Sequence, residues 1–263
     1  MGLSSYEVRP TLHDGDHSDR KDIRGDQADA MKTALVTGAF GDRYLRMAEV
    51  TFPNLKAYAD RIGADFHVLQ ERRFLGGTPH WEKLQLADFL GNYDRVIWSD
   101  CDILVRADCP NLFDVVPESM IGAWDESVVG PWDYPGFLDK WSALTKLPRV
   151  RYPGWHANTG VAVFSKRHLP LFSPPSILAG YEVLWEQGWI NYQAAARRAA
   201  FMDFGWKFNH MFIAPPSRHE SFVIHYCGTI NGSGYSKDIP SGGDYIDVIK
   251  NDLEIWRKRG LIP

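Results

Sequence analysis

Short apolar runs that end at glycine or at polar residues recur along the chain and predict buried strands. Runs of roughly four to eight such residues are typical of strands whose two faces are both covered. The predicted strands span residues 32–40, 64–70, 95–100, 121–126, 160–166 and 221–228. Apolar residues at helical spacing predict helices over residues 44–62, 78–91, 175–188, 191–201 and 244–260.

The order of these elements predicts the fold class. Strands and helices alternate, which is typical of an α/β protein with a mainly parallel, Rossmann-like sheet flanked by helices on both faces. Pro53 is expected to break or kink the first helix, and Gly63 to end it. Ligands of such sheets bind beyond the carboxyl ends of the strands, so the residues that follow the strands are the first candidates for a site.

Two regions lack a regular pattern. Residues 1–30 are polar and charged, which predicts a flexible N-terminal tail, whereas residues 31–263 are expected to form a single domain. Residues 124–156 contain tryptophans among Pro and Gly. Their irregular pattern predicts a large loop rather than a core helix.

Composition excludes some classes of function. Charged residues make up 24% of the 263 residues, and the net charge is −4, so there is no sign of the basic surface that nucleic-acid binding needs. No apolar run approaches the roughly 18 residues of a membrane helix, and the first residues lack the apolar core of a signal peptide. Three cysteines give no disulfide framework. We therefore expect a cytoplasmic protein without a transmembrane segment.

Asp100 and Asp102 stand one residue apart at the end of the predicted strand over residues 95–100. Two aspartates in this spacing most often belong to an exposed turn. Here the residues on both sides are apolar, and two carboxylates at a buried strand end would repel each other and lose hydration. Mg²⁺ and Mn²⁺ prefer carboxylate oxygens and keep coordination positions open for phosphates. The pair therefore predicts a divalent cation beside a phosphate-bearing ligand.

Two other families use similar motifs but fit less well. Phosphatases of the haloacid dehalogenase type also place Asp-x-Asp after a strand, but it is their first strand, and a small residue and Thr or Val follow where this chain has Ile103 and Leu104. The stretch "VTGAFGDRY" starts like a dinucleotide-binding turn. Its last glycine is replaced by Tyr44, and the second strand offers only Glu71, and late, as a ribose ligand.

Four stretches follow one another in a specific order: "GDRYLRMAE" from residue 41, the block from Thr78 to Asp114, "HANTGVAVFSK" from His156 and "FVIHYCG" from Phe222. From about residue 33 to 237 the chain resembles the GT-A glycosyltransferases, closest to the retaining family 8 group that includes glycogenin, galactinol synthases and bacterial lipopolysaccharide galactosyltransferases. The resemblance implies a GT-A fold and transfer of a sugar from a UDP-sugar donor to a carbohydrate or glycoconjugate acceptor.

The same resemblance implies roles for single residues. Asp100, Asp102 and His225 would hold Mn²⁺ or Mg²⁺. The implied catalytic residues are Asp100, Asp102, Lys83 and Gln193. The residues implied to bind the donor are Thr37, Gly38, Tyr44, Lys83, Asn158, Gln193, Gly228 and Lys237.

The chain departs from the family pattern at two places. Tyr192 stands where the family has an Asp beside the sugar, although Gln193 follows it, and the Lys-Pro-Trp after the late His is missing, so that only Lys237 is offered in a longer loop. The Trp-rich region over residues 124–156 is interpreted as an acceptor-side lid. A non-catalytic, metal-dependent sugar-binding protein with the same fold is the alternative.

Each of these residues also has an ordinary structural interpretation. A histidine in an apolar strand, such as His225, is usually a satisfied core residue, and its position at a strand end is what favours the ligand role. A lysine on a helix, such as Lys83, is usually at the surface. Asn158 could belong to a turn before a strand, and Tyr44 could serve packing alone.

Overall fold

The computed structural model describes residues 31–130, 132–211, 218–227 and 245–262. The tail expected over residues 1–30 lies outside these ranges. A six-stranded sheet in the order β2-β1-β3-β6-β5-β7 organises the described chain, and a two-stranded sheet, β4-β8, lies beside it. The strands are β1 Thr33–Gly38, β2 Asp65–Leu69, β3 Arg95–Ser99, β4 Ile103–Val105, β5 Met120–Asp125, β6 Ala157–Ser165, β7 Ala200–Asp203 and β8 Val223–His225.

The larger sheet is mixed but mostly parallel. β1 pairs in parallel with β2 and β3, and β5 pairs in parallel with β7, whereas β6 runs antiparallel to β3 and β5. The pairing of β5 with β6 is irregular: Ala123 pairs with Ala162, but the next residue, Trp124, pairs with Asn158. This irregularity leaves the segment between Asn158 and Ala162 without partners on β5, at the end of the sheet where β3 also ends.

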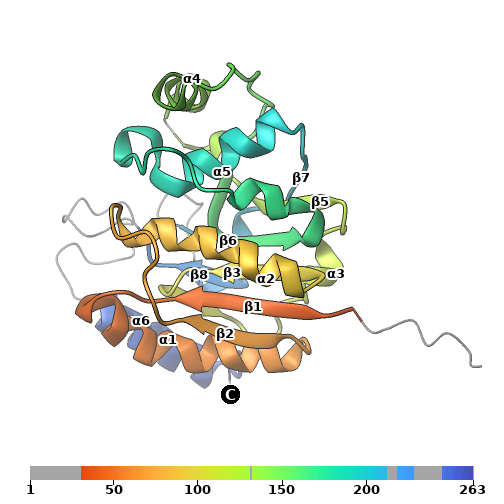
Figure 1. Cartoon of the computed structure of the whole chain (residues 1–263). Coiled ribbons are helices and arrows are strands. Elements are labelled where there is room, and N and C mark those ends of the chain that lie inside the picture. The colour runs from red at the N-terminus through yellow and green to blue at the C-terminus, as the bar shows by residue number, and fades with distance from the viewer. Residues whose placement is uncertain (1–30, 131, 212–217, 228–244, 263) are drawn as a thin grey trace, which may run out of the picture. The chain divides into compact units, whose positions relative to one another are not determined.

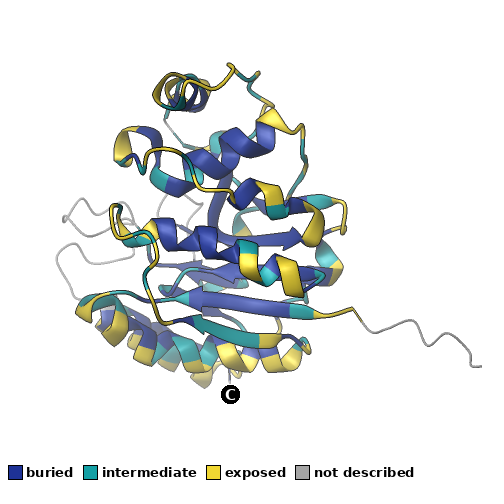
Figure 2. Ribbon diagram, in the orientation of Figure 1, coloured by how far each residue is buried: buried dark blue, intermediate teal, exposed yellow. Residues whose placement is uncertain are grey.

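Helices cover both sides of the sheet (Figure 1). α1 and α6 lie together at the bottom of that view, α2 lies across the middle, and α5 and α4 lie towards the top. Figure 2 shows that the central strands and the inward faces of the helices are buried, while the outer face of α1 is exposed. The edge strands β2 and β7 are less buried. The α-helices are α1 Asp42–Arg61, α2 Leu86–Asn92, α3 Leu112–Val115, α4 Tyr134–Thr145, α5 Trp185–Ala196 and α6 Tyr245–Lys258.

The short helical turns are 3₁₀-helices. They are η1 Pro79–Gln85, η2 Glu126–Val128, η3 Lys166–Phe172, η4 Tyr181–Val183, η5 Trp206–Phe208 and η6 Arg218–Glu220. The helix predicted over residues 78–91 is thus half η1 and half α2. α1 runs unbroken through Pro53 and ends before Gly63, whose φ of 69° is left-handed. None of the described helices combines the length and apolar character that a membrane crossing needs.

The Trp-rich region contains a helix that the sequence analysis did not predict. Asp133 caps α4 by accepting a hydrogen bond from the Gly136 N–H (3.0 Å), and Lys146 ends it with a φ of 57°. Trp141 on α4 is fully buried and packs against Trp189 on α5, with ring centroids 5.3 Å apart. The prediction of an irregular loop was therefore wrong for α4, because tertiary burial of Trp141 stabilises a helix despite Pro and Gly nearby.

The two helices predicted over residues 175–188 and 191–201 were also placed wrongly. α5 is one helix through Gly188, and the predicted second helix ends instead in β7. A Cβ at Gly188 would lie 1.8 Å from the Val183 carbonyl oxygen. Gly188 therefore permits a close backbone approach rather than ending a helix.

Candidate functional site

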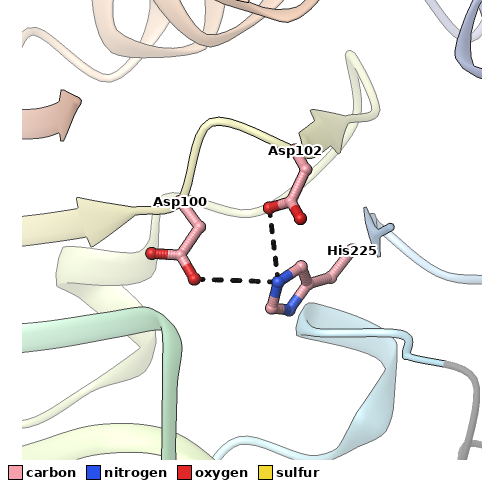
Figure 3. Close-up of side chains that lie close together, drawn as sticks. All are labelled: Asp100, Asp102 and His225. Atoms are coloured by element: carbon pink, nitrogen blue, oxygen red, sulfur yellow. Dashed lines mark ion pairs between the residues drawn. The ribbon is translucent and has the colours of Figure 1, made fainter. Parts of the chain in front are cut away.

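The end of β3 and the strand β8 bring two carboxylates and one imidazole together (Figure 3). The antiparallel pairing of β4 with β8 sets Ile103 opposite His225, so that Asp102 lies beside the histidine. The His225 Nε2 atom lies 3.4 Å from Asp102 Oδ1 and 3.7 Å from Asp100 Oδ2. One ligand atom from each residue lies within 4.8 Å of the others. The three residues predicted to share a cation are therefore close enough to do so.

A chain of side-chain amides fixes the His225 ring. The Gly160 N–H donates to Asn158 Oδ1 (3.0 Å), so the Asn158 oxygen faces inward. Asn209 Nδ2 donates to the same oxygen (2.8 Å), which leaves Asn209 Oδ1 to accept from His225 Nδ1 (2.8 Å). His225 Nδ1 therefore carries a proton, and Nε2 is the atom that faces the aspartates.

Gly160 also lets the ring approach β6. A Cβ at this position would lie 2.2 Å from His225 Cε1, so only glycine leaves room for the imidazole. The Asp100 N–H donates to the Gly160 carbonyl (2.8 Å). Both backbone groups of Gly160 therefore position side chains of the site.

The charges in this cluster are coupled. Burial alone lowers the pKa of His225, but negative charge at Cys227 and at Asp102 raises it well above its usual range. Burial raises the pKa of the Cys227 thiol, so Cys227 is uncharged at neutral pH and Asp102 is the effective partner. Burial likewise raises the pKa of Asp102, but the charge on His225 outweighs it and the pKa falls. A divalent cation would replace the His225 proton as the positive partner of the carboxylates.

Lys83 supplies a second positive charge to the same cavity. Its Nζ atom donates to Glu186 Oε1 (2.8 Å) and Thr159 Oγ1 (3.0 Å) and lies 3.4 Å from Asp100 Oδ1. Burial lowers the pKa of Lys83, but Asp100 and Glu186 raise it further, and the net pKa lies above its usual range. Lys83 is therefore a buried cation rather than the surface lysine that its type would suggest.

These groups line a cavity of about 750 Å³. Of the residues expected to bind the donor, Gly38, Tyr44, Lys83 and Asn158 line it. Thr37 does not line the cavity, and its side chain is fully buried. Gly228 and Lys237 lie outside the described residues.

Gln193 is not part of the cavity lining, and the site role expected for it is not supported. It lies on the buried side of α5, where its Oε1 accepts a hydrogen bond from Arg197. Glu186 and Gln187, six to seven residues earlier on α5, line the cavity instead. The sequence signal for these two residues was the stretch "WEQG", in which an acid and a glutamine stand side by side at the start of the helix. The sequence analysis missed it because it predicted the helix start at Asn191.

Glu126 accepts hydrogen bonds from two other residues that line the cavity, Gln187 and Asn158. Its Oε1 accepts from Gln187 Nε2 (2.7 Å), and its Oε2 accepts from Asn158 Nδ2 (2.8 Å). Burial raises the pKa of Glu126, whereas the two hydrogen bonds lower it. Burial is the larger effect, and the pKa lies at about 7. The sequence analysis did not identify Glu126, which follows β5 directly and carries no motif.

The raised pKa of Glu126 predicts a pH-dependent stability. The ordinary pKa of a glutamate is 4.5. Between pH 4.5 and about pH 7 the folded protein therefore binds more protons than the unfolded chain, so its stability falls as the pH rises through this window. Between about pH 5 and about pH 8, urea unfolding should show the wild-type protein losing up to ~3 kcal/mol relative to Glu126→Gln. The change in stability between the two pH values is taken separately for each protein, so any effect of the substitution that does not depend on pH cancels.

A matched control is Glu118→Gln, because Glu118 is exposed. That variant should follow the wild-type protein at both pH values. An equal loss of stability in the wild-type protein and in Glu126→Gln would show that Glu126 stays ionised in the folded protein.

The fold is shared with solved glycosyltransferase structures. A glycosyltransferase involved in the glycosylation of the major capsid of PBCV-1 matches with a TM-score of 0.54 and 16% identity, over 75% of this chain and 94% of that chain. The galactosyltransferase LgtC in complex with donor and acceptor sugar analogs matches with a TM-score of 0.51 and 16% identity, over 85% and 95%. An active-site mutant of LgtC matches with a TM-score of 0.53 and 17% identity, over 84% and 95%.

No protein-family model matches the sequence, and no curated protein matches it either. At identities this low the likeness to solved structures is one of fold. The expected α/β fold of the GT-A glycosyltransferases is confirmed.

Proposed function

We propose that the protein is a metal-dependent glycosyltransferase that transfers a sugar from a UDP-sugar to a carbohydrate or glycoconjugate acceptor. The observation that carries this proposal is the Asp100–Asp102–His225 cluster, which lines a cavity of about 750 Å³ in a GT-A fold. The unpaired cysteines support a reducing, cytoplasmic location.

The cluster fits Mn²⁺ or Mg²⁺. Asp102 Oδ1 is buried and accepts no hydrogen bond among the described residues. Its charge is offset by His225 Nε2 at 3.4 Å, whose proton a divalent cation would replace. Two carboxylates and an imidazole form a donor set that suits Mn²⁺ better than Ca²⁺, which prefers oxygen ligands throughout. When bound, the cation would neutralise charge on the diphosphate leaving group.

Residues around the cluster would bind the rest of the donor. Lys83 is a buried cation beside Asp100 and would stabilise the same diphosphate. Tyr44 lines the cavity with Gly38, and we assign its ring to the uracil base. These assignments follow the family resemblance residue by residue.

Glu186 and Gln187 would contact the transferred sugar, in place of Gln193. Glu186 Oε2 is buried and has no hydrogen-bond partner within the described parts of the chain, so it can accept from a sugar hydroxyl. Gln187 is held at both ends, by Glu126 and by the Thr159 N–H (3.0 Å). An amide oxygen is a weak nucleophile, so we favour attack by the acceptor on the face of the departing phosphate, with retention of configuration.

The direct test is a screen of UDP-sugars for UDP release in the presence of Mn²⁺. At least one donor should release UDP, and calorimetry should show that UDP binding weakens in excess chelator. Equal UDP affinity with and without chelator would contradict the metal dependence. Tight metal-dependent binding without UDP release from any donor would instead indicate a sugar-binding protein that has kept the fold.

A further inference from the structure

Three aromatic side chains form a cluster at the exposed part of the cavity lining: His80, Tyr181 and Trp185. The rings of His80 and Trp185 are stacked, with centroids 4.5 Å apart and planes at 9°. The Tyr181 ring lies 5.1 Å from that of Trp185, tilted by 55°. Tyr181 is 58% exposed, and His80 is also exposed. Large rings exposed beside a cavity are typical of a binding surface.

The backbone that presents Trp185 is strained. Leu184 has a φ of 56° and Trp185 a φ of 45°, both in the left-handed region and neither a glycine. Such backbone conformations are unfavourable for residues other than glycine, and strain of this kind gathers at functional sites. A relaxed start of α5 at this point would change the direction of the Trp185 side chain.

Neighbouring elements hold this strained turn in place. The Trp141 Nε1–H on α4 donates to the Val183 carbonyl (3.1 Å). Leu184 packs in a cluster with Tyr134 and Phe137, both on α4. α4, in the Trp-rich region, therefore contacts the turn that carries Trp185, and the aromatic cluster lines the cavity.

The aromatic cluster adjoins the residues assigned to the donor. His80 and Lys83 belong to η1, and Trp185 directly precedes Glu186, which pairs with Lys83. A ligand that rests on the cluster thus shares a cavity with the donor sugar. Flat aromatic faces match the C–H face of a pyranose ring.

From these contacts we infer that His80, Tyr181 and Trp185 bind a pyranose ring of the acceptor. This inference rests on the proposed function, because it names the acceptor side of the same cavity. Trp185 contributes most, since it contacts both other rings. The acceptor is accordingly a sugar or carries one at its reactive end.

Saturation-transfer NMR with a panel of methyl α- and β-pyranosides of glucose, galactose and mannose tests binding without any donor. At least one glycoside should receive saturation from the wild-type protein, and Trp185→Ala should weaken its binding about tenfold, or ~1.4 kcal/mol. Trp155→Ala is the matched control, because Trp155 stacks on Phe201 at 4.3 Å and does not line the cavity. No saturation in the wild-type protein, or equal saturation in Trp185→Ala, would overturn the inference.

Kinetics with the donor from the UDP-sugar screen separate the two proposals. Trp185→Ala should raise the KM for the bound glycoside by a larger factor than it lowers the slow, glycoside-free release of UDP. Trp185→Phe should recover much of the loss, because it keeps a flat ring. An equal fall in glycoside-free release would assign Trp185 to the donor and overturn the acceptor role. Absence of UDP release in the wild-type protein would contradict the proposed function alone, since the NMR result stands by itself.

Discussion

Asp102→Asn is expected to slow UDP release at least about a hundredfold, which is the effect of losing one stabiliser of developing charge. The variant keeps the shape of the side chain but removes the charge that lies 3.4 Å from His225. It also removes repulsion between Asp100 and Asp102, so the fold should remain intact. The measurements are initial rates with Mn²⁺ and the best donor of the screen, and a thermal unfolding curve.

Asp108→Asn is the control for this prediction. Asp108 follows the same segment of chain but is exposed and pairs with Arg106 (2.6 Å), so its loss should leave the rate unchanged. Near wild-type turnover in Asp102→Asn would mean that the two aspartates only form a turn.

Lys83→Met is expected to lower both stability and activity. Methionine fills similar space but leaves the Glu186 carboxylate buried without its cation, an arrangement that costs about 3–5 kcal/mol. Urea unfolding measures this loss. UDP release should fall as well, because Lys83 is the cation proposed to meet the diphosphate.

The double variant Lys83→Met/Glu186→Gln separates the two effects. Removing the unpaired charge should restore most of the stability, since a neutral pair avoids the uncompensated charge. Activity should stay below that of the single variant Glu186→Gln. Turnover equal to that of Glu186→Gln would show that Lys83 serves only to neutralise Glu186.

The meeting of Asp100, Asp102 and His225 could be predicted because each follows from a strand pattern and a motif order. Apolar runs place the aspartates after β3 and the histidine on β8, and the family resemblance implied that these positions meet. The pairing of Ile103 with His225 then brings them together. Their role as ligands remains a proposal.

The position of the sugar-side residues could not be predicted in the same way. Leu184, which precedes α5, and Trp185, its first residue, are both left-handed, and no local propensity favours such a start. The start is set by tertiary contacts with α4, including the bond from Trp141 to Val183. Because the helix start was predicted six residues late, the sequence analysis selected Gln193, whereas Gln187 is the glutamine of α5 that lines the cavity.

Short strands were missed for a related reason. β4 and β7 contain three and four residues, too few for a periodic pattern. β4 exists because β8 pairs with it, and β7 because β5 does. Both depend on partners distant in sequence, which composition does not reveal.

The irregular pairing of β6 with β5 constrains how this protein can vary. Between Asn158 and Ala162, β6 has no partner on β5, and there the Gly160 carbonyl and the Thr159 N–H serve Asp100 and Gln187. Adding or deleting one residue in this segment would turn alternate side chains to the opposite face. Loops elsewhere can change in length, but here the number of residues is as constrained as their identity.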